Sequence, residues 1–294
     1  MELRHLRYFV AVAEELHFGR AAVRLGITQP PLSQQIAALE EELGVTLFER
    51  TSRHVALTGP ARLFLTEARK TLAQAAHAID IARRAQQGEV GELSIGFSSS
   101  VPFTPVVVEA LSAFRESRPA VRLNLTEMPR GEQIDALVQD RIDIGFIRGF
   151  ETPALSIPIN VRMLLTEPLL VAMRSDHPLA AQKRLPTIDD LRDAPFVLYQ
   201  RTFGAGFNEH LTQLCARAGF TPRVVQEATG LSTLLGLVAA GMGITILTRS
   251  LGVLHPENIV FRTLDDPEAL SKLWLLYGNR LSTAAQAFVD LIVI

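Results

Sequence analysis

Cysteine is almost absent from this 294-residue chain, which contains one copy, Cys215. A single cysteine excludes a disulfide framework and a cysteine-rich metal site. No uncharged apolar run approaches the roughly 20 residues that a membrane-spanning helix needs. The N-terminus also lacks the basic and apolar segments of a secretory signal peptide. These absences predict a cytoplasmic protein without a metal site.

Enzyme signatures are lacking as well. GFSSS, at residues 96–100, is not a nucleophile elbow, because no glycine stands two residues after Ser98. AAGMGIT offers only an isolated G-x-G that does not open a helix. No P-loop, HExxH or zinc-ligand spacing occurs. We therefore predict no catalytic residue and no cofactor.

The chain does contain enough apolar sequence to fold. Apolar residues make up 48% of it and charged residues 20%, which is typical of globular proteins. Its length allows two or three domains with sizeable cores.

The most informative stretch is FGRAAVRLGITQPPLSQQIAALEEELG, at residues 18–44. It predicts two helices joined by a tight turn, in which Gly26 ends the first helix and Thr28 caps the second. Leu32, Ile36 and Leu39 fall on one stripe of the second helix. The front of its outer surface is then small, polar and almost uncharged, which suits a helix that reads base edges in a DNA major groove with amide and hydroxyl groups. An ordinary pair of surface helices is the alternative. The predicted base-reading end consists of Gln29, Pro30, Pro31, Ser33 and Gln34.

The charge of this region does not by itself indicate nucleic-acid binding. Residues 1–60 carry six arginines against seven glutamates, with no lysine or aspartate, which gives a net charge of −1. Arg4 and Arg50 are candidate DNA contacts. For Arg4, on the first predicted helix, the alternative is a solvated helix arginine, which is commoner. Weak electrostatics in one copy favours binding by several copies together.

Two short strands are predicted in TLFERTSRHVALT, around a polar turn at residues 51–53. Three helices followed by a small hairpin form a winged helix-turn-helix. Arg53, at the hairpin tip, is placed to enter a minor groove.

MELRHLRYFVAVAEELHF, the pattern AA-x-x-L-G-I-T-QPPLS-x-Q-I and LEEELGVTLFER resemble the N-terminal domain of LysR-type transcriptional regulators. The resemblance extends over the whole chain and includes members that control aromatic-compound degradation. In that family position 34 is often arginine, so Gln34 removes one guanine or phosphate contact. The family also often has an Ala-Gly pair where this chain has GPAR after Thr58.

A long helix is predicted from Thr58 to about Gln87. Alanine alternates with leucine or isoleucine at steps of four and three, which is a heptad seam. We interpret it as a dimerisation helix, and the resemblance implies the same; packing against the core of its own domain is the alternative. The seam positions are Ala61, Leu65, Ala68, Leu72, Ala75, Ile79 and Ala82.

Short β-like runs alternate with helices after residue 93, which predicts a parallel, doubly wound α/β architecture. The resemblance implies an effector domain like the periplasmic binding proteins, with crossovers near Arg162 and Leu264. The predicted boundaries are 1–58 for the DNA-binding domain, 59–87 for the dimerisation helix, 88–92 for a hinge and 93–294 for the effector domain. Within it, subdomain I comprises 93–161 and 265–294, and subdomain II comprises 162–264.

Candidate effector residues follow the ends of the predicted strands, where open α/β sheets bind ligands. The serines after LSIGF either bind an anion or cap a helix. Arg148 closes IDIGFI and either pairs with an acidic ligand or forms a salt bridge within the protein. No lysine lies in these segments, so we expect a helix dipole to neutralise the acid. In full, the candidates are Ser98, Ser99, Ser100, Met128, Arg148, Thr202 and Phe203.

The resulting hypothesis is a DNA-binding regulator that senses a small molecule, with a small carboxylate such as a muconate or benzoate as the expected effector. The expected partners are double-stranded DNA, a second copy of the chain through residues 59–87, and a tetramer, with RNA polymerase as a further contact. The alternative is a cytoplasmic solute-binding protein or small α/β enzyme. The N-terminal ninety residues favour the regulator, because neither alternative needs a winged helix or a heptad seam.

Overall fold

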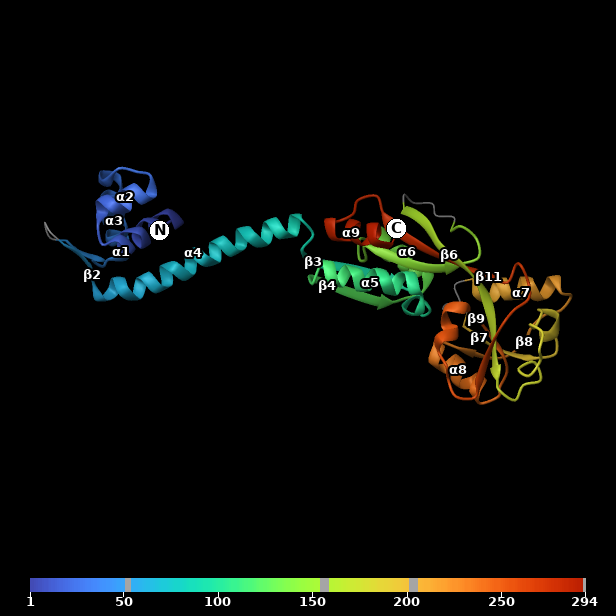
Figure 1. Cartoon of the computed structure of the whole chain (residues 1–294). Helices are drawn as coiled ribbons and strands as arrows, with labels where there is room; N and C mark the ends of the chain where they lie inside the picture. Colours follow the sequence, from blue (N-terminus) through green and yellow to red (C-terminus); the bar gives the residue numbers. More distant parts are fainter. Residues whose placement is uncertain (51–53, 154–158, 201–205, 293–294) are drawn as a thin grey trace. The chain divides into compact units, whose positions relative to one another are not determined.

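The computed structural model describes residues 1–50, 54–153, 159–200 and 206–292. This part of the chain divides into two compact units, Met1–Arg84 and Ala85–Ile294. The first is mainly helical, and the second contains sheets covered by helices (Figure 1). None of the helices described is long and apolar enough to cross a membrane.

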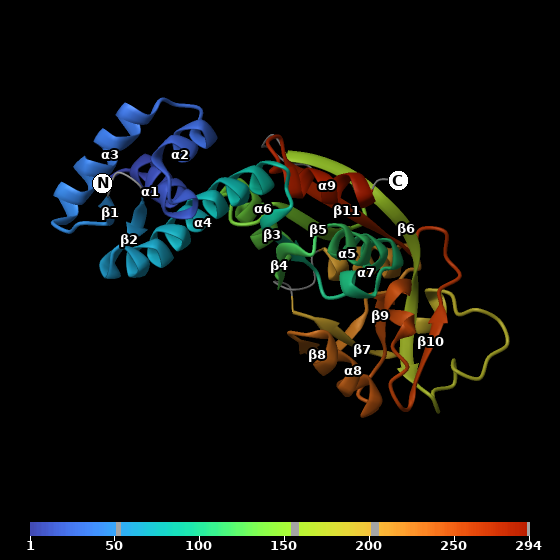
Figure 2. The same ribbon diagram turned by 60° about the vertical axis from the view of Figure 1, so that its left-hand side comes forward.

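Three helices pack together in the first unit, and a hairpin follows them (Figure 2). Phe9, Leu32, Ile36 and Leu39 are fully buried in their common core. The two strands pair antiparallel, with Phe48 opposite Leu57, so the predicted winged helix-turn-helix is confirmed. The elements are α1 (Leu3–Glu15), α2 (Phe18–Leu25), α3 (Gln29–Leu43), β1 (Phe48–Arg50), β2 (Val55–Leu57) and α4 (Gly59–Gln86).

The turn between α2 and α3 has the predicted glycine but not the predicted cap. Gly26 ends α2 at φ 69°, a left-handed conformation that glycine adopts without strain. Thr28 stands at the N-cap of α3, yet its side chain accepts no capping hydrogen bond. An N-cap side chain accepts from the second or third helical N–H. These positions are Pro30 and Pro31, which have no N–H to donate.

Helix α4 divides the predicted seam into two parts. Ala61 and Ala68 are buried, and Leu65 and Leu72 pack against the core of the first unit. Ile79, by contrast, is 51% exposed. The first half of the seam therefore serves its own domain, as the alternative interpretation held, and only the second half remains exposed in the chain.

A sheet covered by helices on both faces forms the first half of the second unit. Helices α5 and α9 pack together on one face, around Phe114, Phe146 and Phe288. Helix α6 covers the other face, against Ile147 and Trp274. The elements are β3 (Val90–Phe97), α5 (Pro105–Ser117), β4 (Ala120–Glu127), α6 (Arg130–Val138), β5 (Ile144–Gly149), β11 (Leu270–Gly278) and α9 (Thr283–Ile292), with a 3-10 turn at Val101–Phe103.

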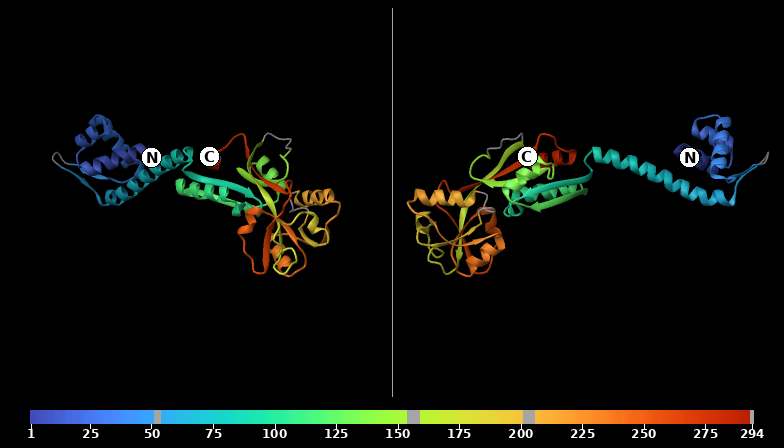
Figure 3. Two further views of the ribbon diagram at one scale, coloured as in Figure 1. Left: turned by 45° about the vertical axis from the view of Figure 1, so that its right-hand side comes forward. Right: turned by 180° about the vertical axis from the view of Figure 1, so that it is seen from behind.

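Helices lie on both sides of the strands in the other half (Figure 3), and each side has its own core. Phe196, Leu211 and Cys215 belong to the core beside α7, and Val197 and Leu234 to the core beside α8. Its elements are β6 (Ile159–Arg174), β7 (Pro195–Tyr199), α7 (Phe207–Arg217), β8 (Arg223–Ala228), α8 (Leu231–Ala239), β9 (Thr245–Thr248) and β10 (Ile259–Thr263), with 3-10 turns at Asp189–Leu191 and Arg249–Val253.

Strand β6 belongs to both halves. Its residues up to Pro168 pair with β11, and those from Leu169 onward pair with β9 and β10. The chain returns at Leu270, where β11 begins. The strand thus changes partners after the expected crossover near Arg162. Parallel pairing, as predicted, joins β3 to β4 and β5, and β7 to β8, but β6 and β11 run antiparallel to their neighbours.

Candidate DNA-binding surface and effector cleft

The outward face of α3 has the polarity that its sequence predicts. Leu32, Ile36 and Leu39 are fully buried, so the opposite face points away from the domain. Gln29, Pro30, Pro31 and Gln34 are exposed on it, and Ser33 is half-buried. Amide and hydroxyl groups therefore stand at the front of the helix, where base edges can be read.

Arg50 is engaged within the protein. Its Nη2 lies 3.0 Å from Oε2 of Glu40, and its guanidinium stacks 4.5 Å above the Phe18 ring. Glu40 also accepts the backbone N–H groups of Leu47 and Phe48, at 2.7 and 3.0 Å. The glutamate thus fastens the hairpin to α3, a role that its place in an acidic cluster did not suggest.

A polar hollow of about 570 Å³ lies at the front of α3, between the helix, the start of α2 and the turn end of the hairpin. It brings together Gln29, Ser33 and Arg50, and Arg20 and His54 line it as well. Sequence reasoning missed the last two as site residues. The other two predicted arginines contribute less: Arg4 pairs with Glu2 at 3.2 Å on the surface, and Arg53 lies outside the described residues.

The ends of β3 and β4 meet at a small cavity of about 210 Å³ in the second unit. Ser98, Ser99 and Met128 all line it, so the structure brings together three of the predicted effector residues. The Ser98 hydroxyl is buried and has no hydrogen-bond partner among the described residues. Thr202 and Phe203 lie outside the described residues.

Tyr199 and Arg130 also line this cavity, and sequence reasoning missed both. Tyr199 ends β7, so the strand-end rule that selected the serines would have selected it too. Burial raises the pKa of Tyr199 to about 12, and a hydrogen bond with Ser99 opposes the shift. The phenol therefore stays protonated at neutral pH and offers a hydroxyl to a ligand.

Arg148 and Ser100 belong to a buried network rather than to the cavity lining. Nη1 of Arg148 lies 2.5 Å from Oε1 of Glu167, and its Nε donates to the Ser100 hydroxyl at 3.0 Å. Nη2 of Arg148 donates to the hydroxyls of Thr104 and Ser250, at 3.0 and 3.2 Å. Arg148 therefore forms a salt bridge within the protein, which was the alternative to its pairing with an acidic ligand. An effector contact for Arg148 or Ser100 stays a prediction.

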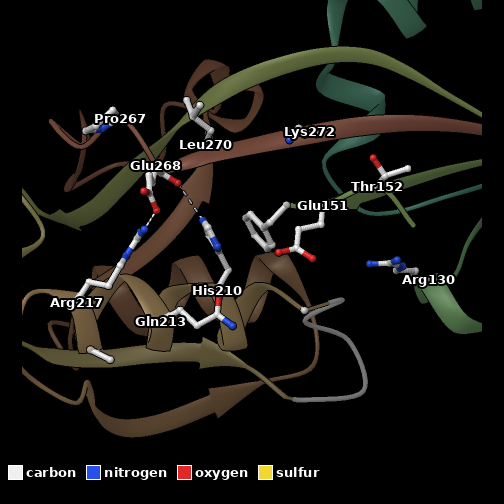
Figure 4. Close-up of a pocket in the computed structure, with 13 residues that line it drawn as sticks. Arg130, Glu151, Thr152, His210, Gln213, Arg217, Pro267, Glu268, Leu270 and Lys272 are labelled. Carbon is white, nitrogen blue, oxygen red and sulfur yellow. Dashed lines mark hydrogen bonds and ion pairs between the residues drawn. The ribbon is translucent and has the colours of Figure 1, made fainter. Parts of the chain in front are cut away.

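A larger hollow of about 990 Å³ opens beside α7 (Figure 4). The His210 ring stacks on Phe150, 3.7 Å between centroids, and its Nε2 lies 3.2 Å from the carbonyl oxygen of Glu268. Burial, followed by the nearby charge of Arg217, lowers the pKa of His210 to about 4. The imidazole is therefore neutral at pH 7, and Arg217 pairs with the Glu268 carboxylate.

Each unit contains a match to a known family. Residues 3–62 match the family described as "Bacterial regulatory helix-turn-helix protein, lysR family", and residues 86–293 match "LysR substrate binding domain". The chain belongs to the LysR family of transcriptional regulators. It is thus a DNA-binding regulator of transcription with an effector-binding domain.

This LysR-family regulator has relatives that match nearly its whole length. It is 42% identical to the uncharacterized HTH-type transcriptional regulator YnfL of Escherichia coli strain K12, over 98% of this chain and 96% of YnfL. It is 40% identical to the regulator AlsR of Bacillus subtilis strain 168, over 94% and 89%. The crystal structure of full-length CbnR with its target DNA matches with a TM-score of 0.84 and 29% identity, over 100% of this chain and 99% of CbnR.

Proposed function

We propose that this regulator reads its operator through the front of α3 and responds to a small carboxylate bound at the cavity between β3, β4 and β7. One observation carries the effector part: strand ends from both halves of the domain line one cavity, which contains a buried, unpartnered Ser98 hydroxyl. A hydroxyl in that state suits an oxygen-rich ligand. The apolar surface of Met128 suits an unsaturated or aromatic body, such as that of benzoate or a muconate.

The proposed mechanism is a population shift. The two halves of the effector domain share β6, and the cavity lies between them. An effector that binds more tightly to one arrangement of the halves shifts the population toward that arrangement. The dimerised α4 helices then transmit the change to the spacing of the DNA-binding domains. The proposal includes a homodimer through residues 59–87, assembly into a tetramer, contact with RNA polymerase and action in the cytoplasm. It assigns no chemical reaction to the chain.

Gln34→Ala is expected to weaken binding to the specific operator by about 1–3 kcal/mol, because a side-chain amide that reads a base is lost. Binding to random DNA should hardly change. Titration of both DNAs by fluorescence anisotropy measures the difference. Equal losses on both would show that Gln34 reads no base.

Gln35→Ala is the matched control for that experiment. Gln35 carries the same amide, one residue further along α3, but its Oε1 lies 3.0 Å from Nε2 of His5 inside the domain. Its removal should leave discrimination between operator and random DNA unchanged.

Ser99→Ala is expected to weaken effector binding by about 1–3 kcal/mol, the contribution of one hydrogen bond to a charged group. DNA binding without effector should remain intact. Calorimetric titration of candidate carboxylates into both proteins tests this, with Ser117→Ala, at the end of α5, as the control. If Ser99→Ala binds the effector as tightly as the wild type, the serines only cap a helix.

A further inference from the structure

Arg130 joins the two hollows of the effector domain. The smaller cavity and the larger hollow share only this residue among those described. Arg130 is the first residue of α6, and only Met128 and Pro129 separate it from the end of β4 at Glu127. Figure 4 shows its guanidinium extending from α6 toward Glu151.

The guanidinium of Arg130 has no counter-ion among the described residues. Its side chain is half-buried, and burial lowers its pKa with no carboxylate to oppose the shift. Two other arginines of this domain do have a carboxylate partner: Arg148 pairs with Glu167, and Arg217 pairs with Glu268. A partly desolvated cation without a partner is unfavourable, and an anion supplied by a ligand would compensate it.

Two further donors near Arg130 have no acceptor among the described residues. They are the buried Ser98 hydroxyl, which lines the smaller cavity with Arg130, and the buried indole N–H of Trp274. Gly149 leaves space between the indole and the arginine: a Cβ at this position would lie 3.4 Å from Nη1 of Arg130 and 3.7 Å from Nε1 of Trp274. Unpartnered donors close to an unpaired guanidinium favour an acceptor rather than a cation as the missing component.

We propose that Arg130 is the charged anchor of the effector site and pairs with the acid group of a small organic anion. The body of this anion then lies in the smaller cavity, against Met128 and Tyr199, and the volume of about 210 Å³ fits one ring or a short chain. This inference rests on the proposed effector site. It replaces the expected neutralisation by a helix dipole with a specific cation, which selects acids over neutral molecules of the same shape.

The test is calorimetric titration of the full-length protein with benzoate and cis,cis-muconate, and with benzamide as a neutral analogue. Arg130→Gln should weaken binding of the acid by about thirtyfold or more and leave benzamide binding unchanged. Arg130→Lys should restore part of the affinity. The matched control is Arg141→Gln, an exposed arginine just beyond the other end of α6, which should bind the acid like the wild type. Unchanged acid binding by Arg130→Gln would overturn the proposal.

A second variant distinguishes a ligand anchor from an internal ion pair. The Glu151 carboxylate lies on the side of the hollow that Arg130 faces (Figure 4). If Arg130 binds the ligand, Glu151→Gln removes a competing negative charge and should tighten acid binding severalfold. If the two side chains instead hold the hollow together, both variants should lose acid binding equally, which would overturn the proposal.

The same titrations separate this inference from the proposed function. If Ser99→Ala loses affinity for the acid and Arg130→Gln does not, the effector binds at the proposed cavity but Arg130 is not its anchor. If the wild type binds neither acid at millimolar concentration, the carboxylate specificity fails and the anchor fails with it. Far-ultraviolet circular dichroism and thermal unfolding, measured on the same preparations, report whether the effector domain of each variant is folded.

Discussion

Glu167→Ala is expected to destabilise the effector domain by about 3–5 kcal/mol, because it leaves the buried Arg148 guanidinium without its carboxylate. Glu167 also accepts the backbone N–H and the hydroxyl of Ser250. Burial lowers the pKa of Arg148, and Glu167 opposes that shift, so removal of the carboxylate exposes the full desolvation penalty.

Denaturant unfolding followed by tryptophan fluorescence measures this loss directly. Trp274 is the only tryptophan of the chain and lies buried in the effector domain. Asp189→Ala is the control, because it breaks a surface pair with Arg192 and should cost much less. The double variant Arg148→Met with Glu167→Leu should recover part of the stability, since no unpaired charge remains buried. Wild-type stability for Glu167→Ala would show that the pair contributes nothing.

Ile79→Asp is expected to weaken the homodimer by about a hundredfold, because it places an unpaired carboxylate in the seam between two α4 helices. The structure determines the choice of residue. Leu72 packs against the core of the DNA-binding unit, so a charge there would unfold that unit as well as disturb the seam. Ile79 is half-exposed in the single chain and can carry a carboxylate without local unfolding.

Sedimentation velocity at micromolar concentration measures the assembly state. Ile81→Asp provides the matched control: it introduces the same charge two residues along α4, on the side of the helix away from the seam. It should leave the dimer intact. If Ile79→Asp remains a dimer, the main dimer interface lies outside the second half of α4, and the heptad pattern does not mark it.

Periodicity predicted the elements of this protein well where neighbours in sequence are also neighbours in space. The buried stripe of α3 follows from Leu32, Ile36 and Leu39 alone, because helical spacing determines which residues share a face. The hairpin and the exposed second half of α4 follow from similarly local patterns. The seam itself was ambiguous, because a stripe of alanines and leucines does not specify which surface it packs against.

The interactions that arrange the two sites connect distant residues, and local patterns could not supply them. Glu40 reaches Arg50 and the backbone of Leu47 only after α3 and the hairpin have packed. The network around Arg148 includes Ser250, which lies 102 residues further along the chain. Arg130 is a different case: it follows the strand end at Met128, and extending the strand-end rule by two residues would have found it.

The paired prolines at the start of α3 affect how this regulator finds its operator. Helix N-termini can bind phosphates through free backbone N–H groups, and Pro30 and Pro31 remove two of these groups from the start of α3. The DNA-binding region also carries a net negative charge, so we expect one copy to have little affinity for random sequence. Residence on non-specific chromosomal DNA should therefore be brief and only weakly sensitive to salt. Occupancy of the operator then depends on side chains that recognise bases and on the joining of several copies.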